Sequence, residues 1–468
     1  MSRDEPSNDA LRAAIHEAGF TYRELADAVK RVARENGDGT VSVDASYISR
    51  WTRTATPHGK TAIYLAEALS RRLGLVVTPS DIGFPSAIST ANTGTPWHTD
   101  TLVALSDLGR QEVQDVERRQ ALRGAAAYSL MAVSVPPRAW WDAARARGAA
   151  RRPTSLQRVG RSDVQAVRAT TQMFLQMDQL HGGGHALAAI RSYLTVDVPR
   201  LLRGSFSDDS TRVDAFSATG ELAYASGWKR FDSGEHAAAQ QDYLVALQLA
   251  AEAGDAPLAG HILRAMAHQA IDLGLGVRAL EIANDSIEGR RYTLASPRER
   301  ALIGVVRARA LAATRHKRLA SQALLQAEDD LAAATAGSDE PDRVFFFGEA
   351  SLAHETGCTL RDMGDLAGAE REFQRSIRTR NAAVFKRTHI VTLGYLGGVQ
   401  LRRGELDRAC ATWTAVMDGL DGIQSGRTRD AVQSIHTLIS PIARRASSEV
   451  RELDRRAVAY LKANPQYA

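Results

Sequence analysis

The sequence predicts an all-α protein in which a small helical domain precedes a long array of helical hairpins. Three observations support this prediction. Alanine and leucine dominate the apolar residues, which form 44% of the 468-residue chain, and long β-branched runs are almost absent. That composition favours helices over strands. Apolar positions recur at helical spacing near the N-terminus, and a pattern of turn and small residues recurs nearer the C-terminus.

The bulk properties fit a cytoplasmic protein without fixing its partners. The net charge of +5 permits nucleic-acid binding but does not demand it. Cys358 and Cys410 lie far apart and form no C-x-x-C pair, which fits a reducing compartment and buried thiols. Residues 1–19 are polar and mixed in charge, unlike a signal peptide. We therefore expect a cytoplasmic protein that does not bind membranes.

Two helices are predicted at the start of the chain. Asn8 or Asp9 can cap the first helix, which stops at Gly19. Thr21 is followed three residues later by Glu24, and this capping-box pattern predicts the start of the second helix. Apolar residues then share one face of that helix; they are Leu25, Val29 and Val32. The first domain is thus predicted to be helical from its first turn.

Two further helices complete this domain, which we expect to span residues 1–85. The Asn-Gly-Asp-Gly run at 36–39 breaks the second helix. Asp44 can cap a short third helix over 45–51. A fourth helix is predicted over 60–73, because Gly74 follows it.

The short helix over 45–51 has the pattern of a DNA-recognition helix. If Ile48 and Trp51 face the core, the residues between them face outward. Serine and arginine can read base edges in the major groove, so we interpret residues 21–69 as a helix-turn-helix unit. Arg50 is suited to pair with guanine. Candidate DNA contacts are Ser46, Tyr47, Ser49, Arg50, Arg53 and Lys60, of which Tyr47 and Lys60 are better placed for phosphate.

The alternative interpretation of this helix is an amphipathic surface helix with solvated polar residues. Residues 1–85 carry eleven basic and eleven acidic side chains. Because this balance gives little attraction to phosphate, we expect DNA affinity to depend on dimerisation.

The segment over 86–161 is predicted to connect the two parts of the protein. Residues 86–96 are rich in Ser, Thr, Ala and Gly, a composition typical of flexible linkers. Residues 138–161 contain seven arginines and one acidic residue, Asp142. This stretch is either a solvated basic connector or a source of additional phosphate contacts.

A repeated pattern predicts helical hairpins over 162–468. Each repeat has a turn residue, a small residue five positions later, a larger or apolar residue at nine, and usually a small one at twelve. The turn residues are Gly234, Gly274, Arg315, Gly364 and Gly404. Glycine allows a sharp turn, and small residues allow close helix packing. The spacings of 40, 41, 49 and 40 residues exceed the roughly 34 of tetratricopeptide repeats, so we predict a tetratricopeptide-like solenoid with longer units.

The array is also predicted to offer a binding groove. Solenoids of helix pairs form concave surfaces that suit peptides, small molecules or partner helices. Polar and aromatic residues cluster in the first repeats; the groove candidates are Tyr224, Trp228, Tyr243, His261 and His268. The alternative for these residues is ordinary packing in the core.

Several segments resemble one family of proteins. They are 47–51 (YISRW), 66–74 (AEALSRRLG), 81–84 (DIGF), 181–184 (HGGG), 199–204 (PRLLRG), 225–228 (ASGW) and 266–270 (MAHQA). On these residues the chain resembles actinobacterial, XRE-like helix-turn-helix regulators with a C-terminal tetratricopeptide domain. The resemblance implies a transcriptional regulator of development or secondary metabolism, which we expect to bind double-stranded DNA as a homodimer. The chain departs from many relatives at Thr52-Arg53-Thr54, where it lacks a glycine.

No motif of the chain predicts an enzyme, a cofactor or a metal site. The Gly-Lys-Thr at 59–61 lacks the upstream glycine and strand of a P-loop. The glycines at 274 and 276 lie between two predicted helices, unlike a dinucleotide-binding turn. The HGGG at 181–184 has no nucleophile elbow to accompany it. We therefore expect a sequence-specific, nucleoid-associated DNA-binding regulator whose repeats mediate dimerisation, sensing or both; the alternative is a tetratricopeptide adaptor that binds protein partners.

Overall fold

The computed structural model describes residues 8–35, 41–53, 55–58, 60–73, 77–84, 97, 99–118, 136–334, 339–443 and 447–464. Over these residues the protein is all-α, as predicted, and the only strands are β1 (Arg158–Val159) and β2 (Ser205–Phe206), one short parallel pair. The predicted break at 36–39 and the predicted linker at 86–96 lie outside the described residues.

The first domain, which we call the head, has helices α1 (Asp9–Glu17), α2 (Tyr22–Glu35), α3 (Ala45–Trp51) and α4 (Thr61–Leu73), followed by the 3-10 turn η1 (Ser80–Ile82). The predicted caps of the first two helices are present. Asn8 Oδ1 accepts the Leu11 N–H at 3.0 Å. Glu24 Oε2 accepts the Thr21 N–H at 2.8 Å, and Thr21 Oγ1 accepts the Glu24 N–H at 3.2 Å. These bonds satisfy amides at helix starts that have no partner within the helix.

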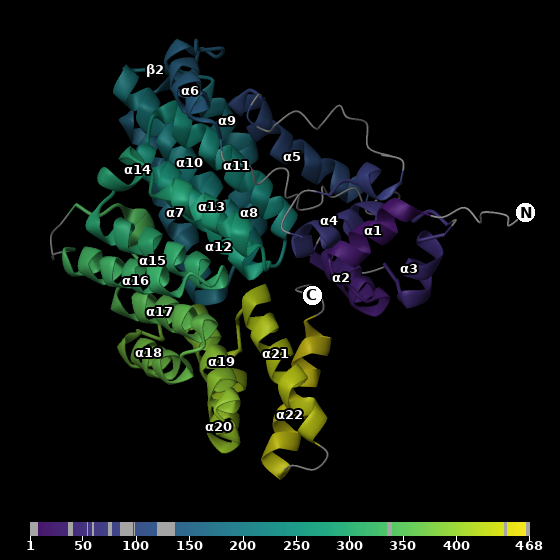
Figure 1. The fold of residues 1–468 in the computed structure, drawn as a ribbon. Coiled ribbons are helices and arrows are strands. Elements are labelled where there is room, and N and C mark those ends of the chain that lie inside the picture. The colour runs from purple at the N-terminus through teal and green to yellow at the C-terminus, as the bar shows by residue number, and fades with distance from the viewer. Residues whose placement is uncertain are drawn as a thin grey trace, which may run out of the picture.

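The head has an apolar core of its own. Helix α2 packs against α3 and α4, and α1 packs against α4 and η1. The side chains that meet there include Leu11, Ile15, Leu25, Val29, Ile48, Trp51, Tyr64, Leu65, Leu69, Ile82 and Phe84. This cluster is separate from the apolar clusters of the rest of the chain, and Figure 1 shows the head at one side of the molecule.

The second part, the array, begins with α5 (Thr101–Arg118), α6 (Arg138–Ala150), α7 (Arg161–His181), α8 (Leu187–Ser192), the π-helical turn η5 (Tyr193–Asp197) and α9 (Val198–Leu202). Five hairpins follow: α10 (Asp209–Asp232) with α11 (His236–Ala253), α12 (Ala256–Asp272) with α13 (Gly276–Ser286), α15 (Pro297–Ala313) with α16 (Lys317–Ala332), α17 (Glu349–Met363) with α18 (Leu366–Thr379), and α19 (Lys386–Arg402) with α20 (Leu406–Gly419). The remaining elements are α14 (Arg290–Thr293), the 3-10 turn η6 (Asp342–Val344), α21 (Gly426–Ala443) and α22 (Ser448–Ala463).

Each hairpin turns at the residue predicted from the repeat. The backbone φ is positive at all five, with values of 83° at Gly234, 77° at Gly274, 64° at Arg315, 92° at Gly364 and 82° at Gly404. Glycine adopts this left-handed conformation without a steric penalty, whereas a residue with a Cβ atom is strained there. Arg315 is thus the one predicted turn residue that holds the conformation against its own side chain.

The small and large positions of the repeat pack as complementary pairs. The five alanines at position +5 are completely buried; they are Ala239, Ala279, Ala320, Ala369 and Ala409. In the repeats whose residue nine positions after the turn is aromatic, the residue seven positions before the turn is glycine. A Cβ atom built at Gly227 or Gly357 would lie 2.7 Å from the ring of Tyr243 or Phe373, respectively. The ring therefore rests directly on the backbone of the preceding helix.

The core of the array begins earlier in the chain than residue 162. Trp97, Leu105 and Trp140 belong to the main apolar cluster, and α5 and α6 both pack against α11. Trp140 Nε1 donates to the Trp97 carbonyl at 2.7 Å. Arg151, one of the seven arginines over 138–161, pairs with the buried carboxylate of Glu252 at 2.5 Å.

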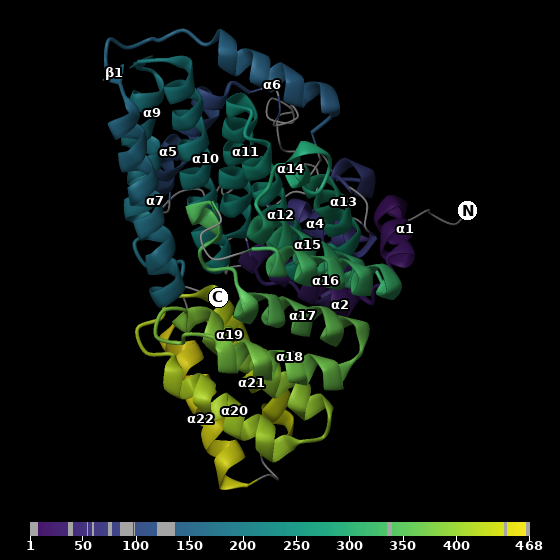
Figure 2. The ribbon, with the colours of Figure 1, turned by 90° about the vertical axis from the view of Figure 1, so that its left-hand side faces the viewer.

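Buried polar contacts join the two ends of the array. Helix α7 packs against α10 and also against α19, as Figure 2 shows. Arg387 on α19 donates to Asp178 on α7 and to Asp232 on α10, both at 2.9 Å. The HGGG segment at 181–184 lies at the same junction, where the Gly184 N–H donates to the Gln424 carbonyl at 2.9 Å. The array is therefore curled so that its first and last hairpins enclose an interior.

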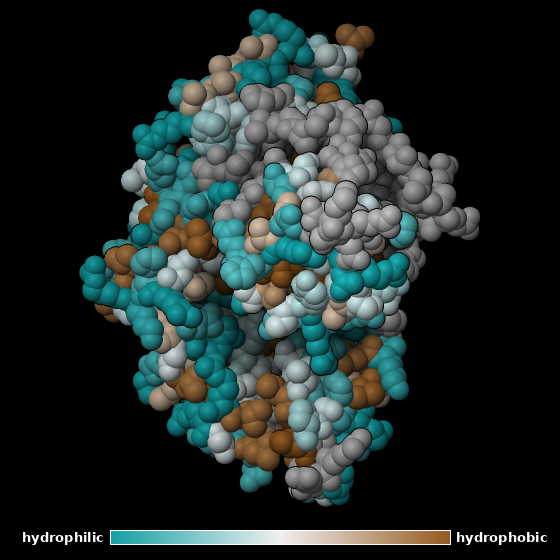
Figure 3. Space-filling view, turned by 45° about the vertical axis from the view of Figure 1, so that its right-hand side comes forward, coloured by the Kyte–Doolittle hydropathy of each residue, from teal (hydrophilic) through white to brown (hydrophobic). Residues whose placement is uncertain are grey.

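The surface is mixed in hydropathy. Figure 3 shows hydrophilic residues over much of one face and apolar residues gathered toward the lower end, where the C-terminal helices lie. Leu438 and Ile442 on α21 are exposed apolar residues of that end. None of the helices in the described part of the chain has the length and apolar character needed to span a bilayer.

Candidate nucleic-acid interface and array cavity

Helix α3 starts at a strong local cap. Asp44 Oδ1 accepts the backbone N–H groups of Ser46 at 2.8 Å and Tyr47 at 3.2 Å, and also the Ser46 hydroxyl at 2.6 Å. The hydrogen bond from the Ser46 side chain, followed by those from the two amides, lowers the pKa of the Asp44 carboxyl. The carboxylate thus occupies the N-terminus of the helix, and base or phosphate contacts must come from side chains along its face.

The two apolar residues of α3 face the core, as the recognition-helix interpretation requires. Ile48 and Trp51 are buried among α2 and α4 residues. The outward face carries four exposed candidates, Ser46, Tyr47, Arg50 and Arg53, together with the half-buried Ser49. Figure 1 shows α3 at the edge of the head that is farthest from the array.

Two guanidinium groups of this face are available for a ligand. The side chains of Arg50 and Arg53 form no hydrogen bond or ion pair with any residue that the structure describes. The Arg50 Cζ lies 5.9 Å from the centroid of the Tyr47 ring, and that ring lies 6.0 Å from the Trp51 ring. A cation over an aromatic face is attracted to it, so Tyr47 orients Arg50 without neutralising its charge.

The other candidate, Lys60, lies at the start of α4 and is half-buried. Its carbonyl accepts the Ile63 N–H at 2.9 Å and so begins that helix. Sequence reasoning missed Lys30 on α2, whose charge contributes to the lowered pKa of Asp44 and therefore lies near the start of α3. Lys30 also pairs with Asp27 at 2.7 Å.

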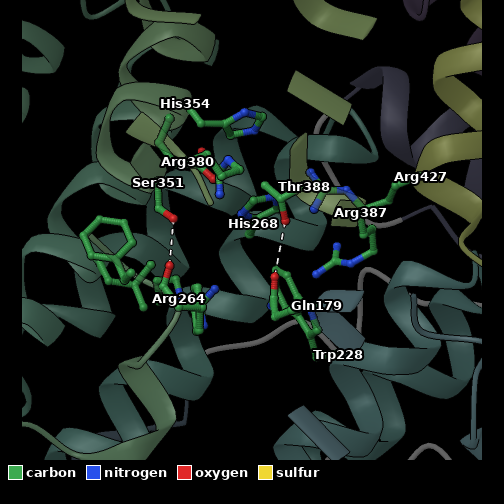
Figure 4. A pocket seen from close by; sticks show the side chains of 14 residues that line it. Gln179, Trp228, Arg264, His268, Ser351, His354, Arg380, Arg387, Thr388 and Arg427 are labelled. Carbon is green, nitrogen blue, oxygen red and sulfur yellow. Dashed lines mark hydrogen bonds between the residues drawn. The ribbon is translucent and has the colours of Figure 1, made fainter. Parts of the chain in front are cut away.

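The interior of the array holds a small cavity of about 50 Å³ that is partly open to solvent. Two of the five groove candidates, Trp228 and His268, line it. Figure 4 shows these side chains among residues from five hairpins and from α7 and α21. The cavity therefore lies where several hairpins of the array converge.

The other three groove candidates, Tyr224, Tyr243 and His261, are buried behind this lining. Tyr243 rests on Gly227, as described above. Tyr224 Oη accepts a hydrogen bond from Arg264 Nη2 at 2.9 Å, and His261 Nε2 lies 3.0 Å from the same nitrogen. Their place is set by packing and by support of Arg264, because close helix contact leaves no room for a ligand at these positions.

Sequence reasoning missed the arginines of this cavity. Arg264, Arg380, Arg387 and Arg427 all line it. They lie on α12, after α18, on α19 and on α21, respectively. No local motif joins residues so far apart in the chain; only the curling of the array brings them together.

A second hollow lies at the seam between the head and the array. It is lined by Arg71, Arg72 and Leu73 at the end of α4, and by residues 274–278 and 313–316 at two hairpin turns. Its charged lining is basic, since Arg278 and Arg315 add to the two head arginines. Two of these charges are balanced locally, because Arg71 pairs with Glu67 at 3.0 Å and Arg278 pairs with Glu281 at 2.5 Å.

The described residues include no cluster of metal-ligating side chains, and their two thiols are buried. No group of three or more His, Cys, Asp and Glu side chains among them is arranged to hold a metal ion. Cys358 and Cys410 are buried free thiols, and burial raises the pKa of Cys358 to about 12. The glycines at 274 and 276 connect α12 to α13, a helix-to-helix turn unlike a dinucleotide-binding strand-to-helix turn.

The comparisons with known proteins concern the head alone. The model of a family described as the SP15 N-terminal domain matches residues 11–85. No curated protein matches the chain, and no solved structure matches it.

Proposed function

We propose that this protein is a sequence-specific DNA-binding regulator in which α3 is the recognition helix. The observation that carries the proposal is the exposed face of α3, where Arg50 and Arg53 have no ionic or hydrogen-bonded partner among the described residues. Exposed guanidinium groups on a short helix suit base edges and phosphates in the major groove. The orientation of α3 away from the array supports access to a duplex (Figure 1).

The roles of the face residues follow from their chemistry. Arg50 is oriented by Tyr47 and is proposed to read guanine through O6 and N7. Arg53 and Lys60 flank the helix and are proposed to contact phosphates. Ser46 and Ser49 are short enough to approach bases closely, although the Ser46 hydroxyl already donates to Asp44.

The regulator is proposed to act as a homodimer in the nucleoid. The head has eleven basic and eleven acidic residues over 1–85, so a single head has little general attraction to DNA. Two heads on half-sites about 34 Å apart would double the specific contacts. Light scattering of the full chain, alone and with an operator duplex, measures this stoichiometry directly.

The array is proposed to control the head through the seam. Helix α12 runs from the cavity, where Arg264 and His268 lie, to the turn at Gly274, which faces the end of α4. A shift of α12 would therefore move the turn at Gly274 relative to the end of α4 in the head. Coupling of this kind needs two arrangements of the seam that differ in DNA affinity.

The test is operator selection from genomic DNA with the full chain, followed by gel shifts and footprints over a salt series. Replacing Arg50 with alanine should weaken operator binding by about 1–3 kcal/mol and relax one base preference. Arg12→Ala is the matched control, because Arg12 is an exposed arginine on α1 and should leave the footprint unchanged. If no duplex is bound specifically at any salt concentration, the chain is instead an adaptor for protein partners.

A further inference from the structure

The lining of the cavity combines apolar and basic side chains. Its apolar residues are Trp228, Leu302, Phe346 and Phe347. Four arginines also line it, with Glu355 as the one acidic residue, and the Arg264 guanidinium lies 5.4 Å from the centroid of the Trp228 ring. Figure 4 shows the labelled arginines on several sides of one space. A pocket of this kind suits a ligand that has both a charged group and an apolar part.

One of the four arginines is already neutralised. Arg387 donates to the carboxylates of Asp178 and Asp232, both at 2.9 Å. The acidic residue of the lining is also engaged, because Glu355 accepts a bond at 3.0 Å from Arg309, which lies behind the lining. The pairs of Arg387 join the two ends of the array. The partners of the other three arginines must therefore be considered separately.

Arg264, Arg380 and Arg427 have no ion pair with any carboxylate in the described part of the chain. Arg264 is 1% exposed and Arg380 is 7% exposed, yet the Nε of each has no hydrogen-bond acceptor. Their remaining bonds go to neutral groups: Arg264 donates to Tyr224, and Arg380 to the Ala350 carbonyl at 2.9 Å. A buried charge with unsatisfied donors is unfavourable unless an anion compensates it.

The titration of two neighbouring groups agrees with an excess of positive charge around Arg380. Burial, and then the charge of Arg387, lowers the pKa of Arg380 to about 10. Burial, and then Arg380, holds the pKa of the lining residue His354 well below 6.5. Arg427 differs, because Asp272 and Asp232 help to raise its pKa.

We propose that this cavity binds a small organic oxyanion, whose acid group accepts hydrogen bonds from Arg264 and Arg380 and whose apolar part packs on Trp228 and Phe346. Guanidinium groups bind phosphate and carboxylate through the same donors, so a phosphate ester and a carboxylic acid are the two sources of this chemistry. Anion binding is measured on the protein without DNA, so a failure of this proposal is distinguishable from a failure of the proposed DNA binding.

The first experiment separates the two sources and the two parts of the ligand. Isothermal titration calorimetry of the full chain uses phenyl phosphate, benzoate, inorganic phosphate and neutral phenol as probes. Binding of phenyl phosphate more tightly than benzoate assigns a phosphate ester, and the reverse assigns a carboxylate. Either anion must bind more tightly than phenol. Equal binding of phenol, or no binding of any anion at millimolar concentration, would overturn the proposal.

The second experiment tests the residues. Arg380→Gln should weaken the bound anion by about tenfold or more, the amount expected for losing a charge-assisted hydrogen bond. Arg300→Gln is the control, because Arg300 pairs with Asp330 at 3.0 Å outside the cavity and should leave anion affinity unchanged. Should Arg380→Gln fail to fold, Arg427→Gln replaces it, since Arg427 has no hydrogen bond with another described residue. Its expected loss is smaller because nearby acids partly balance it.

The free protein gives a signature that a purely structural arginine would not give. Removing an uncompensated buried charge should leave the melting temperature of the free Arg380→Gln protein unchanged or higher, while the stabilisation by the anion falls. A lower melting temperature of the free protein with unchanged anion affinity would show that Arg380 serves the fold alone and would contradict the proposal.

Discussion

The head and the array hold their arginines in opposite environments. In the head, Arg50 on α3 and Arg53 just after its end are exposed and have no ionic partner among the described residues. In the array, Arg343 and Arg387 are buried and each bonds two carboxylates, Glu299 with Glu221 and Asp178 with Asp232. The same side chain therefore presents charge to a partner in one region and joins distant helices in the other.

The difference follows from the size and shape of the two regions. The head is a small cluster of four helices, and its buried polar residues among those described are few: Thr52, Glu67 and Ser70. The array curls so that five hairpins share one interior, and long polar side chains must then be buried and paired. The comparison teaches that arginine content alone does not reveal a binding face; the pairing of each guanidinium does.

The largest effect should come from breaking the buried pairs of Arg387. Arg387→Met leaves Asp178 and Asp232 without their shared cation and should lower the free energy of unfolding by about 3–5 kcal/mol. Arg375→Met removes exposed pairs with Glu349 and Glu372 and should change it by at most about 1 kcal/mol. Urea unfolding followed by circular dichroism measures both. Equal losses in the two variants would remove the distinction between the regions.

Acid should destabilise the array before the head. Burial lowers the pKa of His261 to about 4 from its ordinary 6.5, and burial also holds His268 and His354 well below 6.5. The unfolded chain then binds more protons than the folded one between these values, so stability is lost as pH falls from about 6.5 to 4, by about 3 kcal/mol for one buried ring. Asp285 opposes this in part, because burial raises its pKa to about 7.

Hydrogen exchange at pH 7 and at pH 5 resolves the two regions. Protection of amides in α10 and α12 should fall at the lower pH, whereas amides of α2 should keep theirs, because the histidines of the described head residues, His16 and His58, are exposed. Equal loss of protection in both regions would mean that the buried rings do not govern the acid response.

Neighbouring glycines of α19 provide a smaller and sharper test of array packing. A Cβ atom at Gly397 would lie 2.6 Å from Trp413 Cδ1, whereas one at Gly398 would meet nothing within 4 Å. Gly397→Ala should therefore destabilise the array by about 1–3 kcal/mol through overpacking. Gly398→Ala should stabilise it by up to about 1 kcal/mol, because alanine favours the helix. Thermal unfolding in which both variants shift the same way would reject the proposed packing of Trp413.

The smallest effect is expected at the hairpin turn of α15 and α16. Arg315→Gly relieves a left-handed conformation that is unfavourable by about 1–2 kcal/mol, but glycine gains freedom in the unfolded chain. The net stabilisation should be about 0.5–1 kcal/mol. The reverse change at Gly274, to alanine, should destabilise by a similar amount, since its Cβ atom would meet nothing and only strain remains. Differential scanning calorimetry should show a higher melting temperature for Arg315→Gly and a lower one for Gly274→Ala.

The outward face of the candidate recognition helix could be predicted from local sequence alone. Asp44 caps α3 as predicted, and Ile48 and Trp51 fix which side of so short a helix is buried. The arginines of the cavity could not be predicted in this way, because Arg264 on α12 and Arg380 just after α18 lie in different repeats and belong to no local motif. Among the groove candidates, the sequence could not separate Trp228, which lines the cavity, from Tyr243, which is packed against Gly227.

By itself the sequence determined the helices, their caps and the five hairpin turns, because each depends on hydrogen bonds and backbone angles among residues close together in the chain. Only the tertiary structure decided where the array begins, at Trp97, and that its ends meet through Arg387. It also decided that unpaired arginines share one cavity. The physical reason is that burial and ion pairing over long sequence separations depend on how the hairpins curl, and small rotations at every repeat add up to that curvature.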